Sequence, residues 1–174
     1  MIRGQKNVLR GWLRGHIVLA AAIAIVSAPL FADASEPDPS GVLGFWMDPP
    51  KKLAVEIYPC GEHLCAKIVW LGKKYLKNGD YKRDRKNPDP ALRQRSWCGI
   101  EVITGLKPKR DDYWKNGRFY YPKKGRTYDV DIKLKGDDRL ELRAYLGIRL
   151  LGKSETWLRP EPDRILACVP TPEG

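Results

Sequence analysis

Two segments of the chain alternate strictly between apolar and polar side chains, and this alternation constrains the fold more than any other feature. The apolar positions are Tyr128, Val130, Ile132 and Leu134 in the first segment and Leu140, Leu142, Ala144 and Leu146 in the second. A period of two residues places successive side chains on opposite faces of a β-strand, so one face packs into a core and the other meets water. Residues 136–138, Gly-Asp-Asp, are typical of a tight turn, so the two strands are expected to pair as an antiparallel hairpin.

Six further segments are rich in β-branched and aromatic residues and are bounded by glycine, proline or polar turns. They are residues 44–46, 53–58, 66–71, 98–104, 114–121 and 154–159. No helix-length amphipathic run follows residue 40. We therefore predict an all-β domain, an antiparallel meander of about eight strands. Closure into a small barrel is favoured over a two-sheet sandwich because closure removes exposed sheet edges.

The first 34 residues have the pattern of a signal-peptide helix. Basic residues precede an apolar stretch at 17–26, and Ala32-Asp33-Ala34 fits a signal peptidase site, with cleavage after Ala34 or, alternatively, after Ala32. A retained membrane anchor is disfavoured, because the uncharged run 17–32 has 16 residues and contains Pro29, whereas a spanning helix needs about 20 apolar residues. We expect a periplasmic or secreted protein with no stable membrane span after cleavage.

The remaining chain is predicted to consist of three parts. Residues 35–40 form a short polar leader, residues 41–159 form the β-barrel domain, and residues 160–174, with four prolines, form an extended C-terminal extension. The predicted mature part, 35–174, contains 28 of the 32 Lys and Arg residues and 20 of the 21 Asp and Glu residues, a formal charge of +8. Its length suits one domain.

All four cysteines lie after residue 34, where an oxidising compartment would allow disulfides to persist. Cys60 and Cys65 frame a short turn between two predicted strands, which favours their pairing across a hairpin. Cys98 and Cys168 would then form a second bridge, although four cysteines allow three connectivities. A metal site is not expected, because the cysteine spacing does not match a zinc pair and His63 adds only one ligand.

A basic segment interrupts the strand pattern between residues 72 and 95. Between residues 73 and 86 its cations are Lys73, Lys74, Lys77, Lys82, Arg83, Arg85 and Lys86. With Tyr75 and Tyr81, this loop suggests one function: a surface that interacts with acidic lipid or cell-wall polymer in a salt-dependent manner. Nucleic acid is not an expected partner, because export would separate the protein from it.

Within the same loop, Asp89 followed by Pro90 predicts one short helical turn with an aspartate N-cap. We expect this turn to carry Leu92 inward and Arg93 or Arg95 outward. Two arginines at this position could clamp an anionic group. Alternatively, they could pair with aspartates at the barrel rim.

Several catalytic classes lack their motifs. His63 is the single histidine after residue 34, and there is no Gly-x-Ser-x-Gly sequence or glycine-rich phosphate loop, so no cofactor is predicted. Glu56, Glu101 and Glu155 lie in predicted strands and could meet inside a barrel. A carboxylate-dependent hydrolase is therefore kept as a further alternative.

Three motifs occur together and in order: Ile-Tyr-Pro-Cys-Gly at 57–61, Cys-x-Lys-Ile-Val-Trp-Leu at 65–71 and Asn-Pro-Asp-Pro-Ala-Leu-Arg-x-Arg at 87–95. With Gly147-Ile148 and Thr156-Trp157, they resemble the bacterial family of unknown function 2147. The resemblance implies an exported protein without an agreed set of catalytic residues to carry over.

A likeness of architecture concerns Gly44-x-Trp46 on the first predicted strand and Arg159 after the last. The pair is similar to the lipocalin-type arrangement, in which a cation packs over an early tryptophan at the closed end of a barrel. The expected barrel is therefore lipocalin-like.

Taken together, these features favour an exported envelope protein that binds a small amphipathic or anionic molecule without catalysis, rather than an enzyme. Five tryptophans and eight tyrosines after residue 34 supply aromatic surface for such binding. The candidate ligand-binding residues are Asn87, Asp89, Arg93, Arg95, Trp70 and Tyr145.

Overall fold

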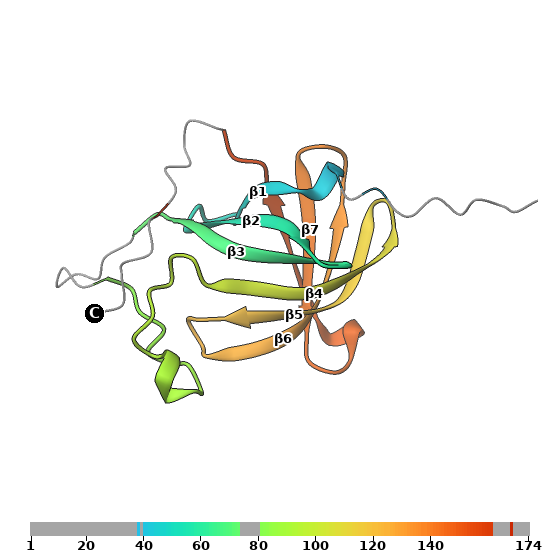
Figure 1. Ribbon diagram of the computed structural model, residues 1–174. Helices are drawn as coiled ribbons and strands as arrows, with labels where there is room; N and C mark the ends of the chain where they lie inside the picture. Colours follow the sequence, from blue (N-terminus) through green and yellow to red (C-terminus); the bar gives the residue numbers. More distant parts are fainter. Residues whose placement is uncertain (1–37, 39, 74–80, 162–167, 169–174) are drawn as a thin grey trace, which may run out of the picture. The chain divides into compact units, whose positions relative to one another are not determined.

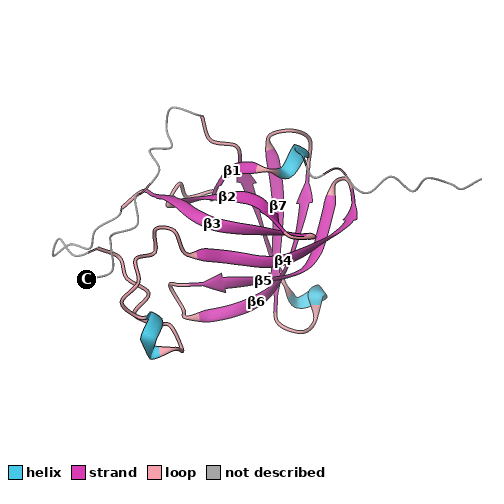
Figure 2. Cartoon of the chain, in the orientation of Figure 1, coloured by secondary structure: helices cyan, strands magenta, loops and turns pink. Residues whose placement is uncertain are grey.

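The alternating segments form the strands of one closed β-barrel in the computed structural model, which describes residues 38, 40–73, 81–161 and 168 (Figure 1). The strands are β1 (Gly44–Met47), β2 (Leu53–Cys60), β3 (His63–Leu71), β4 (Glu101–Arg110), β5 (Tyr113–Tyr121), β6 (Arg126–Leu134), β7 (Arg139–Tyr145) and β8 (Lys153–Leu158). Three short 3-10 turns accompany them: η1 (Ser40–Val42), η2 (Pro90–Leu92) and η3 (Arg149–Leu151) (Figure 2). The predicted signal helix, residues 1–34, lies outside the described residues.

The strands follow one another around the barrel in chain order, and each pairs antiparallel with its neighbour. The ring closes between β1 and β8, where Met47 pairs with Leu158. The predicted eight-stranded antiparallel meander is therefore confirmed, and it closes into the barrel that was favoured over the sandwich.

The register between β6 and β7 places the alternating apolar residues on the same side, except Leu146: β7 ends at Tyr145, and Leu146 is exposed instead of facing the core as expected. Val130 pairs with Ala144, Ile132 with Leu142 and Leu134 with Leu140, and directly opposed residues project from the same face of a sheet. Of these residues, Val130, Ile132, Leu140 and Leu142 are all buried in one hydrophobic core. This face is thus the barrel interior, and the alternate residues Asp129, Asp131, Glu141 and Arg143 face outward.

One end of the interior is sealed by Trp46 and Arg159. The guanidinium of Arg159 lies 4.1 Å from the Trp46 ring centroid and donates to the carbonyls of Leu43 and Gly41, next to η1. The Trp46 indole donates to the Val42 carbonyl at 2.8 Å. The stacking of Arg159 on Trp46 matches the lipocalin-type arrangement expected from the sequence.

Two disulfides join the cysteines in the favoured pairing. Cys60–Cys65 bridges the β2–β3 hairpin, and Cys98–Cys168 ties the C-terminal extension to the long β3–β4 connection. The backbone amide of Cys168 also donates to the Val69 carbonyl at 2.7 Å. Two disulfides indicate an oxidising, extracytoplasmic compartment.

The structure corrects the expected start of β4. Residues 98–100 were expected to belong to this strand, but it begins at Glu101 and continues to Arg110. Gly99 adopts a φ of 83°, a left-handed conformation that a regular strand does not use. The extra residues at the other end extend the hairpin with β5.

The short turn η2 forms where it was expected but is oriented differently. Asp89 caps it by accepting from the Ala91 amide, and Pro90 occupies its first position. Leu92 is 38% exposed, so the expectation that it points inward is wrong. The loop is anchored instead by a buried carboxylate, Asp84, which is described below.

Candidate functional site

A carboxylate inside the barrel reaches solvent at the end where β5 finishes and β6 begins, here called the Tyr121 end. Glu155 on β8 pairs with Leu142 and Trp157 pairs with Leu140, so Glu155 shares the interior face with these core residues. Nevertheless, Glu155 is exposed. Most of β8 is exposed, and this strand pairs with β1 only at Leu158, so Glu155 is accessible to solvent although it lies on the interior face.

Aromatic side chains line the same end. On β5 the register pairs Gly117 with the core residue Val130 and Phe119 with Tyr128, which places Phe119 and Tyr121 on the interior face. Their rings are stacked, with centroids 6.1 Å apart. Phe119 packs against the core, and Tyr121 is only partly buried. The Tyr121 end therefore combines ring faces with a solvent-accessible carboxylate.

The negative charges at this end act on the Tyr121 hydroxyl. Burial raises the pKa of the Tyr121 hydroxyl, and the negative charges of Glu155 and Asp48 raise it further. Asp48 is nearly buried and accepts the backbone amides of Lys52 and Leu53, which fixes the β1–β2 turn. The buried Trp157 indole lies 3.4 Å from Glu155, a long hydrogen bond. Tyr121 is consequently a hydrogen-bond donor at neutral pH.

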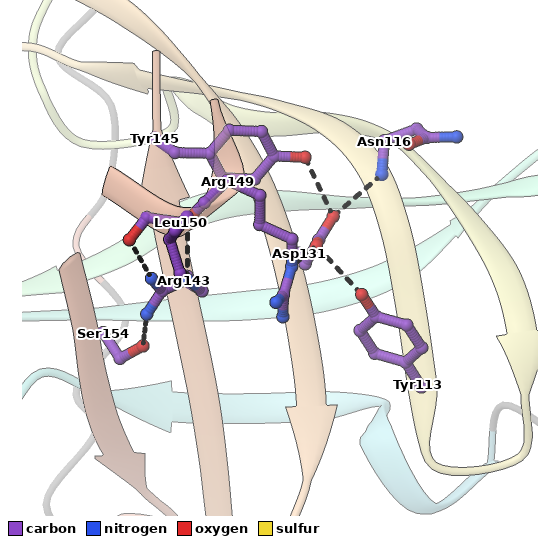
Figure 3. A network of polar contacts seen from close by, with 8 residues as sticks. All are labelled: Tyr113, Asn116, Asp131, Arg143, Tyr145, Arg149, Leu150 and Ser154. Carbon is purple, nitrogen blue, oxygen red and sulfur yellow. Dashed lines mark hydrogen bonds and ion pairs between the residues drawn. The ribbon is translucent and has the colours of Figure 1, made fainter. Parts of the chain in front are cut away.

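A second polar cluster surrounds Asp131 on the outer face of β6 (Figure 3). Asp131 is 3% exposed and accepts from Tyr113 at 2.9 Å, Tyr145 at 3.3 Å and Arg149 at 2.6 Å. The backbone amide of Asn116 donates to the same carboxylate. Burial, with the Asp131 carboxylate as a further cause, raises the pKa of both tyrosine hydroxyls, so they remain donors. The cluster joins β5, β6 and β7 to η3.

A third polar cluster, around Asp84, contains four of the candidate binding residues. Asp84 is fully buried and accepts from Asn87 at 2.7 Å, from Arg95 through two nitrogens at 2.9 and 3.0 Å, and from the Tyr120 hydroxyl at 2.6 Å. Arg93 donates to the Asn87 carbonyl at 2.8 Å. Both arginines are thus engaged by their own loop.

The structure separates the other two candidates from this loop. Trp70 lies with Met47, Ala54 and Val69 in a small hydrophobic cluster apart from the main core. Tyr145 belongs to the Asp131 cluster. Asn87, Asp89, Arg93 and Arg95 come together, whereas Trp70 and Tyr145 do not join them. Binding by any of the six residues stays a prediction.

The three strand carboxylates do not converge. Glu56 on β2 forms an ion pair with Lys67 at 3.0 Å, and Glu101 accepts from Tyr58, whose pKa is raised to about 12 by burial and by that hydrogen bond. Both lie opposite Lys67 in the sheet, on the outer face, whereas Glu155 faces the interior. The expectation that they meet inside the barrel is wrong.

The basic loop is described only in part, because residues 74–80 lie outside the described residues. Lys82 lies 5.6 Å from the Trp97 ring centroid, and burial is the main cause that lowers its pKa. Arg83 donates to the Gln94 carbonyl. Lys82 and Arg83 thus contact other residues of the loop itself. Interaction of the basic loop with acidic lipid or cell-wall polymer stays a prediction.

Sequence patterns missed the most deeply buried polar residues. Asp84 stands among lysines and arginines, and Asp131 occupies a position that alternation assigns to the wet face. Among the residues that the structure describes, no group of three or more His, Cys, Asp or Glu side chains could hold a metal ion. None of the described helical segments is long and apolar enough to cross a bilayer.

Comparison with known proteins places the fold and the family. The chain is similar to a solved structure described as protein HP1028 from the human pathogen Helicobacter pylori, which belongs to the lipocalin family; the two share 26% identity over 71% of this chain and 85% of that chain, with a TM-score of 0.60. No curated protein matches. The model of a family described as "Uncharacterized protein conserved in bacteria (DUF2147)" matches residues 44–159, the whole barrel and Arg159. The chain therefore belongs to the DUF2147 family.

Proposed function

We propose that the protein binds a small amphipathic molecule at the Tyr121 end of its barrel and does so without catalysis. The observation that carries this proposal is Glu155, which faces the interior and is still exposed. Eight-stranded barrels are either filled by side chains or hold one small ligand, as in lipocalins. The lipocalin family of the similar structure supports the second alternative.

The arrangement favours an amphipathic ligand over a purely anionic one. Apolar parts of a ligand would pack against Phe119 and the Tyr121 ring, because these partly buried rings still present apolar surface. A polar head that donates hydrogen bonds would meet Glu155, whereas an anionic head would be repelled by it. Arg93 and Arg95, the expected anion clamp, already bond groups of their own loop.

The proposed setting is the bacterial envelope, outside the cytoplasm. Its support is the pair of disulfides, which persist in oxidising compartments, and the signal-like pattern of residues 1–34. Export itself is part of the proposal. Cell fractionation of the bacterium that makes the protein, followed by intact-mass measurement, would test it; a cytoplasmic protein that retains residues 1–34 would contradict it.

Two experiments test the binding site. Native mass spectrometry of protein purified gently from its own source should show a bound small molecule of defined mass. Dye binding should then locate the site: the neutral amphipathic dye N-phenyl-1-naphthylamine should bind, and Glu155→Gln combined with Tyr121→Leu should weaken binding at least about tenfold, the equivalent of about 1.4 kcal/mol.

A matched control uses Glu141→Gln. Glu141 lies on β7 opposite Thr156, on the outer face, and pairs only loosely with Lys135 at 3.9 Å. This variant should bind the dye like the unaltered protein. An equal loss in both variants, or no dye binding by a folded protein, would contradict the proposed site.

A further inference from the structure

The connection between β7 and β8 exposes an unusual concentration of large apolar side chains. Seven large hydrophobic residues are exposed in the described part of the chain, and four of them lie within six consecutive positions. These are Leu146 (59%), Ile148 (62%), Leu150 (83%) and Leu151 (77%). Such surface is unfavourable in water and marks an interaction site when it is grouped in this way. Residues 146–152 are called the apolar loop below.

The apolar loop is not a loose segment, because Arg143 holds its backbone. The guanidinium donates to the carbonyls of Arg149 and Leu150, each at 3.0 Å, and to the Ser154 hydroxyl at 3.0 Å (Figure 3). Within the loop, the amides of Leu151 and Gly152 bond the carbonyls of Ile148 and Arg149. One arginine thus uses its donors to satisfy the carbonyls of the most exposed turn.

Two aspartates on β6 fix the loop from the other side. Asp131 binds the Arg149 side chain at 2.6 Å, and Asp129 accepts the Gly147 amide at 3.2 Å. Gly152 packs so closely that a Cβ would lie 2.8 Å from the Ala144 carbonyl. The amides of Gly147, Ile148, Leu151 and Gly152 and the Arg149 side chain therefore bond the barrel or other groups of the loop, while the aliphatic side chains are left in water.

This combination suits a bilayer surface. A backbone that enters an apolar medium must have its polar groups satisfied internally, and here Arg143 satisfies two carbonyls at the tip. Basic groups remain beside the apolar side chains: Arg143 has no carboxylate partner among its hydrogen bonds, and Lys153 is exposed. Residues 35–174 carry a formal charge of +8.

We propose that the apolar loop inserts its aliphatic side chains into the surface of a bilayer that contains anionic phospholipids, and so holds the barrel at that membrane. Apolar insertion combined with electrostatic attraction to anionic lipid is the physical basis of peripheral membrane binding. The inference is independent of the proposed ligand site, because it rests on the outer face and the β7–β8 connection.

A protein partner fits the apolar loop less well. Four aliphatic side chains of this exposure present on the order of 400 Å² of apolar surface, about half of the roughly 800 Å² that each partner contributes to a stable protein interface. The excess positive charge favours an anionic surface over a second copy of this chain, which would carry the same charge.

The test measures sedimentation with lipid vesicles. All strands, the core and both disulfides lie within Ser35–Gly174, one of the compact units of the chain, so this part contains what its fold requires. It should be used because the apolar run at 17–32 would itself bind lipid. Vesicles of phosphatidylglycerol and phosphatidylcholine should sediment the protein, and vesicles of phosphatidylcholine alone should do so at least tenfold less.

Leu150→Ser combined with Leu151→Ser should reduce binding to the anionic vesicles about 10- to 100-fold without changing the near-ultraviolet circular dichroism, because both side chains are exposed. Phe45→Ser combined with Leu92→Ser, which removes exposed apolar residues elsewhere, should leave binding within twofold of the unaltered protein. Glu155→Gln should also leave it unchanged, which separates this test from that of the ligand site.

Absence of vesicle binding would overturn the proposal, as would binding that the Leu150 and Leu151 substitutions leave unchanged. Sedimentation equilibrium gives the remaining outcome. A dimer that dissociates in the Leu150→Ser, Leu151→Ser variant would show that a second copy covers the loop, and it would likewise overturn the membrane assignment.

Discussion

Replacing Asp84 with alanine should destabilise the protein more than replacing any other carboxylate of the long loop. Asp84 is fully buried, and its side chain accepts from Asn87, Arg95 and Tyr120. Removing one partner of a buried ion pair costs about 3–5 kcal/mol, because the other charge is left unpaired. The Arg95 side chain is 27% exposed and can regain some hydration, so we expect about 3 kcal/mol.

Urea unfolding of residues 35–174, followed by tryptophan fluorescence, measures this change in the free energy of unfolding. For a domain of this size, about 3 kcal/mol corresponds to a fall in melting temperature of about 10 °C. Asp84→Asn should lie between the unaltered protein and Asp84→Ala, because an amide oxygen still accepts from Tyr120 but does not neutralise Arg95.

Asp89→Ala is the matched control. Asp89 belongs to the same loop, but its side chain makes one exposed capping bond to the Ala91 amide at 2.9 Å, which is worth about 1 kcal/mol. If Asp84→Ala costs no more than Asp89→Ala, the buried carboxylate does not anchor the loop, and the reasoning is refuted.

Three further predictions follow from the backbone, the sealed end and the tyrosines. Gly125→Ala should cost at least about 2 kcal/mol in urea unfolding, because φ is 63° and the new Cβ would meet a backbone carbonyl of the long loop at 1.8 Å, whereas Gly136→Ala, with φ of 72° and open space, should cost about 1 kcal/mol. Arg159→Lys should destabilise by about 1–2 kcal/mol, since an ammonium group cannot stack on the tryptophan ring and bond three carbonyls at once; a melting temperature equal to that of the unaltered protein would contradict this. The pKa of Tyr120 is raised from 10.0 to about 12, first by burial and then by Asp84. Between these pH values the folded state keeps a proton that the unfolded state releases, so the stabilisation present below pH 10 should be lost as the pH rises to 12. Tyr120→Phe should show a smaller loss of stability over that interval.

The number and order of strands could be predicted from sequence, because the causes are local. Alternation with a period of two is a property of consecutive residues, and turns such as 122–125 and 136–138 contain the residues that tight turns require. The cap at Asp89 and the Cys60–Cys65 bridge are equally local, since their partners lie within a few residues. Each of these features is present in the structure.

Tertiary structure alone decided which charged residues became buried and which polar side chains came together. Asp131 occupies a position that the alternation assigns to the solvent-facing side of β6. It is buried because η3 folds back over the outer face and supplies Arg149. Leu92 was expected inside, but the long loop is held by Asp84, whose partner Tyr120 lies 36 positions away. Such contacts depend on how distant segments pack, which no local pattern encodes.

The same division applies to function. The sequence by itself determined the strands, their turns and the Cys60–Cys65 bridge, because alternation and turn chemistry act between near neighbours. Only the folded barrel assigned Glu155 to the interior and Glu56 to the exterior, since the face that a residue takes depends on the register with the neighbouring strand. The exposed apolar loop, held by Arg143, likewise exists only in three dimensions.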